Sequence, residues 1–249
     1  MNPTASIGAD VEYPETDGLP MAENTLQFRW IVTIKEGIQF LFRGRDDVFV
    51  AGDLFWYPVQ GHPEIRTAPD TLVVFGRPPG DRGSYKQWEE GGIAPQVVFE
   101  VLSPGNTAEE MRNKRAFYER YGVQEYYLYD PDDNELEGWI RAGTELATVG
   151  AMSGWTSPRL GIRFDWGDAG LRLLRPDGTA LETYDELGER ALAEKNRADA
   201  EERRAATLKR RADAEKRRAE TAEQRAETAE QRAQILAERL RALGIDPDA

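Results

Sequence analysis

The sequence contains no cysteine and a single histidine, His62, among its 249 residues. Disulfide bonds and thiolate chemistry are therefore excluded, and zinc would have only carboxylates and this histidine as ligands. That set of donors argues against a structural zinc site. His62 lies in the segment VQGHPE, between a glycine and a proline, and we expect it to be a solvated turn residue without a catalytic role.

Long apolar runs are also missing. No uninterrupted apolar stretch approaches the ~20 residues that a membrane-spanning helix needs. The opening residues, MNPTASIGADVEYPETDG, lack the basic start and apolar segment of a secretory signal. With 40% apolar and 10% aromatic residues, the chain can still fill a core. We therefore expect a folded, cytoplasmic protein with no membrane partner.

Positive charge is scarce over most of the chain. The sequence has 45 acidic and 32 basic residues, a formal net charge of −13. From Asp185 onward 16 acidic and 15 basic residues nearly balance, so the preceding body carries a net charge of −12. Such a body repels a phosphate backbone at long range, unlike a nucleic-acid binder with a basic patch. Chemistry on DNA would need bound cations or a locally positive cleft.

The pattern of apolar residues and chain breakers predicts four regions. These are an arm rich in proline and glycine, a main domain, a long helix and a short tail, over residues 1–20, 21–180, 181–243 and 244–249. The arm has no core of its own, so its order would depend on docking. The main domain opens with apolar residues at steps of four, which predict an amphipathic helix from Ala22 to Phe42, formed by Leu26, Trp30, Ile34, Ile38 and Phe42, with Ile31 and Phe40 widening the stripe.

Strand patterns and one further helix fill the rest of this domain. Short branched and aromatic runs predict strands within 48–59, 71–75, 96–102, 125–130 and 136–141, with more short strands through Trp166 and Leu174. Thr107 as N-cap, with Glu110 three residues later and Gly122 as the stop, predicts a helix that ends at Tyr121. The segment between the second and third strands, rich in glycine and proline, is expected to be a long surface loop that could gate a site. The fold class is therefore α/β.

The segment from about Leu181 to Leu243 is dominated by alanine, glutamate and arginine and contains no proline, which predicts one long helix. Two identical heptads, RAETAEQ, start at Arg218 and Arg225 and set a period of seven, typical of a left-handed coiled coil. Its a and d positions are Ala219, Ala222, Ala226, Ala229, Ala233, Leu236, Leu240 and Leu243. A single charged helix stabilised by i, i+4 pairs is an equally weighted alternative, because alanine buries little surface.

Three residues could carry chemistry: Asp70 before the strand TLVVF, Glu100 inside the strand VVFEVL, and Lys114 on the following helix. A carboxylate among valines and a phenylalanine is costly unless a cation or hydrogen-bond donors meet it. Two carboxylates on adjacent strands would attract a divalent ion such as Mg²⁺, which accepts one or two carboxylates and substrate phosphates. Such an ion suits phosphodiester hydrolysis. Lys114 would then orient or deprotonate the attacking water, or stabilise the developing charge.

The runs APDTLVVFG, VVFEVLSPGNT and KRAFYERYGVQEYYLYDP resemble the Uma-two-type family of restriction-endonuclease-like proteins, a branch of the PD-(D/E)XK nuclease fold. The resemblance covers roughly residues 20 to 170 and not the helical tail. It implies a central mixed β-sheet flanked by helices, with Asp70 and Glu100 as metal ligands. Leu102 stands at the usual lysine position, and Lys114 matches the place from which the family supplies a lysine on the following helix.

The leading hypothesis is a metal-dependent endonuclease that uses Mg²⁺ or Mn²⁺, acts on DNA and forms a homodimer through its coiled coil. The alternative is a scaffold that keeps the nuclease fold without the chemistry and acts through its coiled coil. A hydrolase of a non-nucleic substrate has no motif of its own. Other polar residues have simpler interpretations: Asp53 as a solvent-facing strand residue, Ser103 as a turn residue, and Tyr118 or Tyr121 as packing residues.

Overall fold

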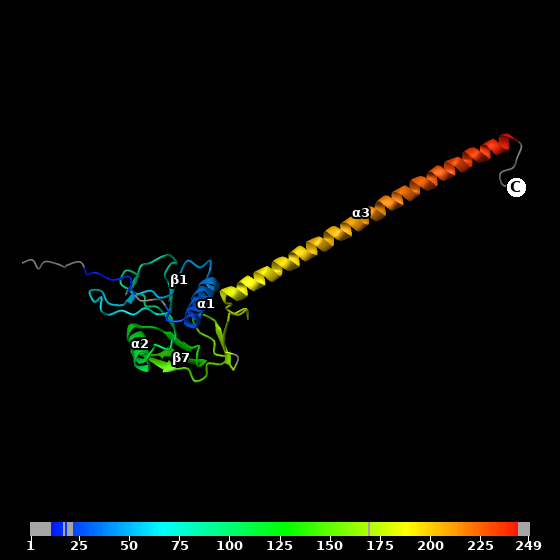
Figure 1. The fold of residues 1–249 in the computed structure, drawn as a ribbon. Helices are drawn as coiled ribbons and strands as arrows, with labels where there is room; N and C mark the ends of the chain where they lie inside the picture. The colour runs from blue at the N-terminus through cyan, green and yellow to red at the C-terminus, as the bar shows by residue number, and fades with distance from the viewer. Residues whose placement is uncertain (1–10, 17, 19–21, 169, 244–249) are drawn as a thin grey trace, which may run out of the picture. The chain divides into compact units, whose positions relative to one another are not determined.

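The computed structural model describes residues 11–16, 18, 22–168 and 170–243. The chain divides into two compact units, residues 1–186 and 187–249. The first unit contains every strand and the first two helices, and the second contains nearly all of a third helix (Figure 1). The predicted tail from 244 to 249 lies outside the described residues.

The first unit is built on a six-stranded mixed sheet in the order β1-β3-β5-β6-β7-β8. Only β5 and β6 are parallel among these neighbouring pairs. The strands are β1 Val48–Ala51, β3 Thr71–Phe75, β5 Val97–Val101, β6 Glu125–Asp130, β7 Glu135–Ala142 and β8 Glu145–Thr148. Helix α2, Ala108–Tyr121, connects the parallel strands, as a crossover between parallel neighbours requires. The α/β class is therefore as the sequence predicts.

Apolar cores lie on both faces of this sheet. Helix α1, Thr25–Leu41, packs Ile31, Ile34 and Ile38 onto one face, and α2 packs Met111 and Tyr118 onto the other. Alternate residues of β3 and β5 enter the two cores, which explains their continuous apolar sequences. The predicted helix from 22 to 42 is confirmed, but Phe40 lies outside its buried stripe and is 50% exposed.

Two small sheets extend the cores. Strands β9 Arg163–Gly167 and β10 Gly170–Leu174 form an antiparallel pair. This pair confirms the short strands that were expected through Trp166 and Leu174. Strands β2 Trp56–Tyr57 and β4 Tyr85–Lys86 form a parallel pair. The prediction that 76–95 is only a surface loop is therefore wrong. Tyr85 is fully buried against Phe49, and its packing orders this glycine- and proline-rich segment.

The described part of the N-terminal arm docks on the small β2–β4 sheet. The Tyr13 ring contacts those of Tyr57 and Trp88, at centroid distances of 5.2 and 5.0 Å. The Tyr57 hydroxyl donates a hydrogen bond to the carbonyl of Pro14 at 2.6 Å. The order of this segment therefore comes from contacts with the main domain.

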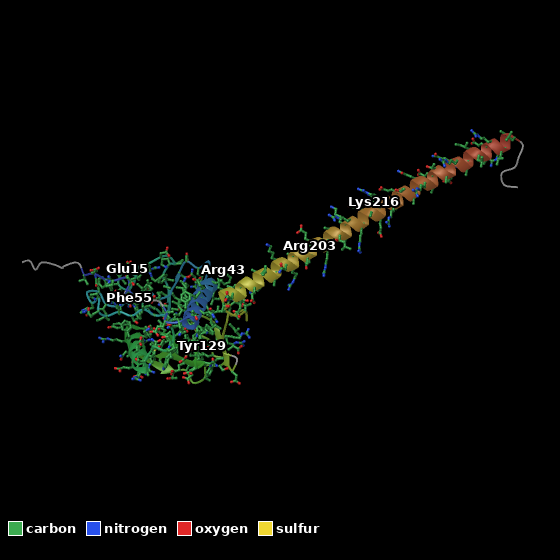
Figure 2. The ribbon with its side chains drawn as sticks, viewed as in Figure 1. Glu15, Arg43, Phe55, Tyr129, Arg203 and Lys216 are labelled. Atoms are coloured by element: carbon green, nitrogen blue, oxygen red, sulfur yellow. The ribbon has the colours of Figure 1, made fainter. Side chains whose placement is uncertain are left out.

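Helix α3, Tyr184–Ala242, is one continuous helix of 59 residues that begins three residues after the predicted start. Thr183 and Glu186 cap it reciprocally: the Glu186 carboxylate accepts from the Thr183 backbone nitrogen at 2.7 Å, and the Thr183 hydroxyl accepts from the Glu186 nitrogen at 3.3 Å. None of its residues is buried, and side chains such as Arg203 and Lys216 stand out from it (Figure 2). No helix among the described residues is long and apolar enough to span a membrane.

Candidate active site

Strands β3 and β5 bring Asp70 and Glu100 together. Thr71 pairs with Phe99 in the antiparallel register, so the preceding Asp70 lies opposite Glu100. Asp70 lies two residues before Leu72, and Glu100 lies two residues after Val98. Both of these apolar residues belong to the core beneath α2, so the two carboxylates lie on the face of the sheet that this helix covers. The backbone nitrogen of Val101 donates to Asp70 Oδ2 at 2.7 Å, which fixes the aspartate against β5.

Helix α2 supplies two partners for Glu100, whose side chain is 3% exposed. Lys114 Nζ lies 3.0 Å from Glu100 Oε2, and the Tyr118 hydroxyl donates to Glu100 Oε1. Residues four apart lie on one helix face, so both side chains reach the same carboxylate. Tyr118 itself is fully buried and stacks on Trp56. The buried carboxylate is therefore met by a cation and by a hydroxyl.

The electrostatics of the group follow from burial and from the closeness of its charges. Burial and, next, the charge of Glu100 raise the pKa of Asp70 well above its usual range. Burial alone lowers the pKa of Lys114, but Glu100 and Asp70 together outweigh it, so that pKa is raised. Burial and then Glu100 also raise the pKa of Tyr118. Two mutually repelling carboxyls thus share one ammonium group.

The capping of α2 holds Lys114 in place. The Thr107 side chain accepts from the Glu110 backbone nitrogen at 3.1 Å, and Gly122 ends the helix in the left-handed region at φ 98°. Both predicted caps are confirmed. The Glu110 carboxylate does not close the capping box; its oxygens lie 3.3 and 3.4 Å from the Asn106 side-chain nitrogen. A negative side chain in the first turn still stabilises the helix.

A cavity of about 430 Å³ opens beside this group. Its walls come from α2 and from the segment that leads into β3: Arg66, Thr67, Thr107, Glu109, Glu110, Asn113, Lys114 and Phe117. Of the three candidate residues, Lys114 lines this cavity, with a side chain that is 23% exposed, whereas Asp70 and the 3% exposed Glu100 do not line it. A ligand in this cavity would therefore contact the Lys114 side chain.

The remaining polar residues that the sequence singles out lie elsewhere or have structural partners. Asp53 is exposed, as expected, but in a turn after β1 at φ 48° and not within a strand. His62 is exposed, with Nδ1 2.9 Å from a Glu64 carboxylate oxygen. The Ser103 hydroxyl donates to the Glu23 carboxylate at 2.7 Å, and the Ser103 carbonyl accepts from the Asn106 backbone nitrogen at 3.0 Å, so Ser103 is a turn residue, as expected.

The part of the chain that contains this site matches the family model described as "Uma2: Putative restriction endonuclease", over residues 19–183. The chain belongs to this family. A solved structure described as a putative nuclease belonging to DUF820 from Anabaena variabilis ATCC 29413 is 14% identical, with 55% of this chain and 75% of that chain covered and a TM-score of 0.41. No curated protein matches the sequence. The family match confirms the sequence resemblance, and the mixed sheet with helices on both faces confirms the expected α/β fold class.

Membership of the Uma2 family raises the question of a divalent metal, since proteins of this restriction-endonuclease-like class generally use one. Among the described residues, no group of three or more His, Cys, Asp or Glu side chains is arranged to hold an ion. The pair Asp70 and Glu100 nevertheless fits Mg²⁺, which needs only one or two carboxylates and takes its other ligands from water and phosphate. Their mutual repulsion, which contributes to the raised pKa of Asp70, is the strain that a cation would relieve.

Sequence reasoning missed the role of Tyr118 as a partner of Glu100, because it treated this tyrosine as a packing residue. Both descriptions hold, since the ring is buried in the core while the hydroxyl reaches the carboxylate. The spacing of four between Lys114 and Tyr118 was the available signal, because it places both on one helix face.

Proposed function

We propose that this Uma2-family protein is a metal-dependent endonuclease that hydrolyses phosphodiester bonds in DNA. The convergence of Asp70, Glu100 and Lys114 beside an open cavity carries the proposal. Two carboxylates and a lysine are the residue types that PD-(D/E)XK nucleases use, and here they come from β3, β5 and α2. The family match supports a nuclease-like function, and the site chemistry supports the metal and the substrate.

Asp70 and Glu100 would hold Mg²⁺ or Mn²⁺. When bound, such an ion lowers the pKa of a coordinated water and neutralises charge on the phosphodiester. The Lys114 ammonium would orient the attacking water or stabilise the negative charge that develops on the phosphate. Tyr118 is a positioning residue, because its hydroxyl holds Glu100 and faces the core and not the cavity. Each role follows from where the side chain lies.

The acidic body makes the cation essential for binding DNA as well as for cleaving it. A net charge of −12 before Asp185 opposes the approach of a polyanion. A divalent ion at Asp70 and Glu100 would remove part of that repulsion at the point where the phosphate must sit. A homodimer through α3 would bring two such sites to one duplex, as cleavage of both strands requires.

Calorimetric titration of Mn²⁺ or Mg²⁺ and a plasmid-nicking assay on the same samples test the proposal. We expect the wild type to bind metal and nick DNA, and Asp70→Asn and Glu100→Gln to lose both. Glu125→Gln is the matched control, because Glu125 is also a buried carboxylate of the sheet but points to the face covered by α1. Nicking that survives in folded Glu100→Gln would refute the assignment.

One observation favours a second function, a scaffold that keeps the fold without the chemistry. Both oxygens of Glu100 already have donors from the chain, so this carboxylate is satisfied without a metal. Helix α3, in which no described residue is buried, would then be the functional part. Absence of metal binding and nicking in a protein that still self-associates would favour this function over the endonuclease.

A further inference from the structure

A second cavity, of about 330 Å³, lies between α2, the segment that leads into it from Leu102, and strands β6 and β7. Leu102, Met111 and Leu128 give it an apolar floor. Leu102 occupies the position at which the standard nuclease motif has its lysine, so the departure from that motif makes part of an apolar cavity wall. Thr107 lines this cavity and also the cleft beside Lys114, so the two spaces adjoin at the start of α2.

Two buried donors among the lining residues have no hydrogen-bond partner. Tyr126 is fully buried and Trp139 is 4% exposed, and their rings stack at a centroid distance of 4.9 Å. Within the described chain, neither the Tyr126 hydroxyl nor the Trp139 indole nitrogen is satisfied. An unsatisfied buried polar group destabilises the fold and calls for an explanation. Neither polar atom is accessible to solvent in this structure, so a ligand with acceptor atoms on its edge would satisfy both groups once the two rings turn toward the cavity.

The lining of the same cavity is positive on balance, because it includes Arg112 and Arg115 but only one acid, Glu137. The Arg115 guanidinium lies over the Trp139 ring, 5.3 Å from its centroid, and Arg112, one helical turn earlier, is exposed at the rim. Neither arginine is in a salt bridge with any residue that the structure describes. In a body with a net charge of −12, a cavity lined by two arginines and one glutamate favours an anionic ligand. The ligand would thus combine a flat apolar part with a negative group.

We propose that this cavity binds one nucleotide of the substrate strand, with its base against the apolar floor and its phosphate at Arg112. A nucleobase has apolar faces and acceptor atoms on its edge, and unpaired bases are commonly held by stacking on aromatic or guanidinium planes. Free phosphate would leave the apolar floor empty, and an apolar ligand would leave Arg112 unused. The inference rests on the proposed nuclease function, because that function places a DNA strand beside α2.

The cavity and the catalytic group are linked through Tyr118. Its ring lies 5.1 Å from that of Tyr126, centroid to centroid, and its hydroxyl donates to Glu100. A base held at Tyr126 would therefore belong to a nucleotide next to the phosphodiester being cleaved. This base pocket would give the enzyme a preference for unpaired or distorted DNA near the cut, since a paired base cannot enter it.

Calorimetric titration with the four 5′-deoxynucleoside monophosphates, in buffer containing EDTA, tests the base pocket without metal or cleavage. We expect Tyr126→Phe to weaken nucleotide binding about three- to tenfold, the worth of one hydrogen bond. The same change should leave the melting temperature unchanged or higher, because the hydroxyl that it removes has no partner. A merely structural tyrosine would not separate binding from stability in this way.

Thr71→Val is the matched control. It also removes a buried hydroxyl without a partner from the central sheet, but on the face opposite the cavity. It should raise or preserve stability and leave nucleotide affinity unchanged. Arg112→Gln, at an exposed position that tolerates change, should weaken binding of nucleotides while sparing the corresponding nucleosides.

Three results would overturn the proposal: no nucleotide binding by the wild type, equal affinity of wild type and Tyr126→Phe, or binding of inorganic phosphate as tight as that of nucleotides. Glu100→Gln separates this inference from the proposed nuclease function, because it should abolish nicking without weakening nucleotide binding in EDTA: the change removes a negative charge and no part of the cavity lining. Nicking without nucleotide binding would reject only the base pocket.

Discussion

Glu100 and Glu125 are both buried carboxylates of the central sheet, but they meet different partners. Glu100 faces α2 and receives the ammonium of Lys114, whereas Glu125 faces the opposite core and receives only neutral donors from Tyr127, Ser157 and the backbone of Arg159. The ammonium group beside Glu100 could stabilise negative charge on a phosphate. The neutral donors around Glu125 only hold that carboxylate in place within the fold. The sequence indicates that Glu100 interrupts a strand, but only the fold shows which buried acid has a cationic partner.

The buried carboxylate of Glu125 leads to a prediction about how the stability of the protein changes with pH. Burial raises the pKa of Glu125, although hydrogen bonds from Ser157, Tyr127 and Arg159 lower it in part. The folded state then binds this proton more tightly than the unfolded state does. Its contribution to stability is therefore complete below the ordinary pKa of glutamate and is lost as the pH rises through the raised value.

Because Glu125→Gln removes this titration, the free energy of unfolding of the wild type, relative to the variant, should fall as the pH rises from about 4 to 7. Urea unfolding at a series of pH values measures the difference. The exposed Glu135, at the start of β7, gives a control variant, Glu135→Gln, that should retain the wild-type trend. A difference between wild type and Glu125→Gln that stays constant across the series would contradict the assignment.

The proposed catalytic role of Lys114 gives a second prediction at this scale. Lys114→Ala should lower the nicking rate by about 10²–10³-fold, the usual cost of losing a group that stabilises developing charge. Leu102 follows Glu100 by two residues and is half-buried at the edge of the adjoining cavity. Adding Leu102→Lys to Lys114→Ala restores the standard spacing of the motif, so part of the activity should return. If the folded double variant nicks no faster than Lys114→Ala, the two positions are not equivalent.

At the scale of elements, the sequence predicts those that local chemistry determines and misses those that depend on tertiary contacts. Helix α2 could be bounded from Thr107 and Gly122 because caps act within one turn. Strand β4 could not, because Tyr85 and Lys86 lie among glycines and prolines and pair with a strand nearly thirty residues earlier. The same holds for the site. Asp70 and Glu100 could be predicted because they belong to a sequence motif, whereas the cavity lined by Tyr126 depends on how α2 crosses the sheet.

The cap of α2 should couple stability to activity. Thr107→Ala removes the acceptor for the Glu110 nitrogen and should cost about 0.5–2 kcal/mol of unfolding free energy. Because the first turns of this helix position Lys114, the nicking rate should fall as well. Thr107→Ser keeps the acceptor and should stay close to wild type in both urea unfolding and nicking. Equal stability of the alanine and serine variants would show that the cap contributes little.

At the scale of the molecule, the two units differ in net charge. The body before Asp185 carries a net charge of −12, whereas the rest is nearly neutral through alternating acids and bases. A nearly neutral, highly charged helix can approach a second copy of itself without the long-range repulsion that the acidic body would impose. Charge repulsion would therefore oppose self-association less through α3 than through the body. The repeat of seven residues predicts which side chains of α3 would face a second copy. The coiled coil itself stays a prediction.

The end of α3 offers the sharpest test of this coiled coil. Leu236 falls on the predicted seam and is 60% exposed, whereas its neighbour Ile235 is 54% exposed but lies off the seam. Burying a leucine at an interface contributes about 1.5–3 kcal/mol, so Leu236→Ala should raise the dissociation constant of a dimer at least about tenfold. Ile235→Ala removes similar apolar surface and should leave association unchanged. Sedimentation equilibrium over a wide concentration range distinguishes the cases: a wild type that stays monomeric, or two variants that weaken association equally, would favour the single charged helix over the coiled coil.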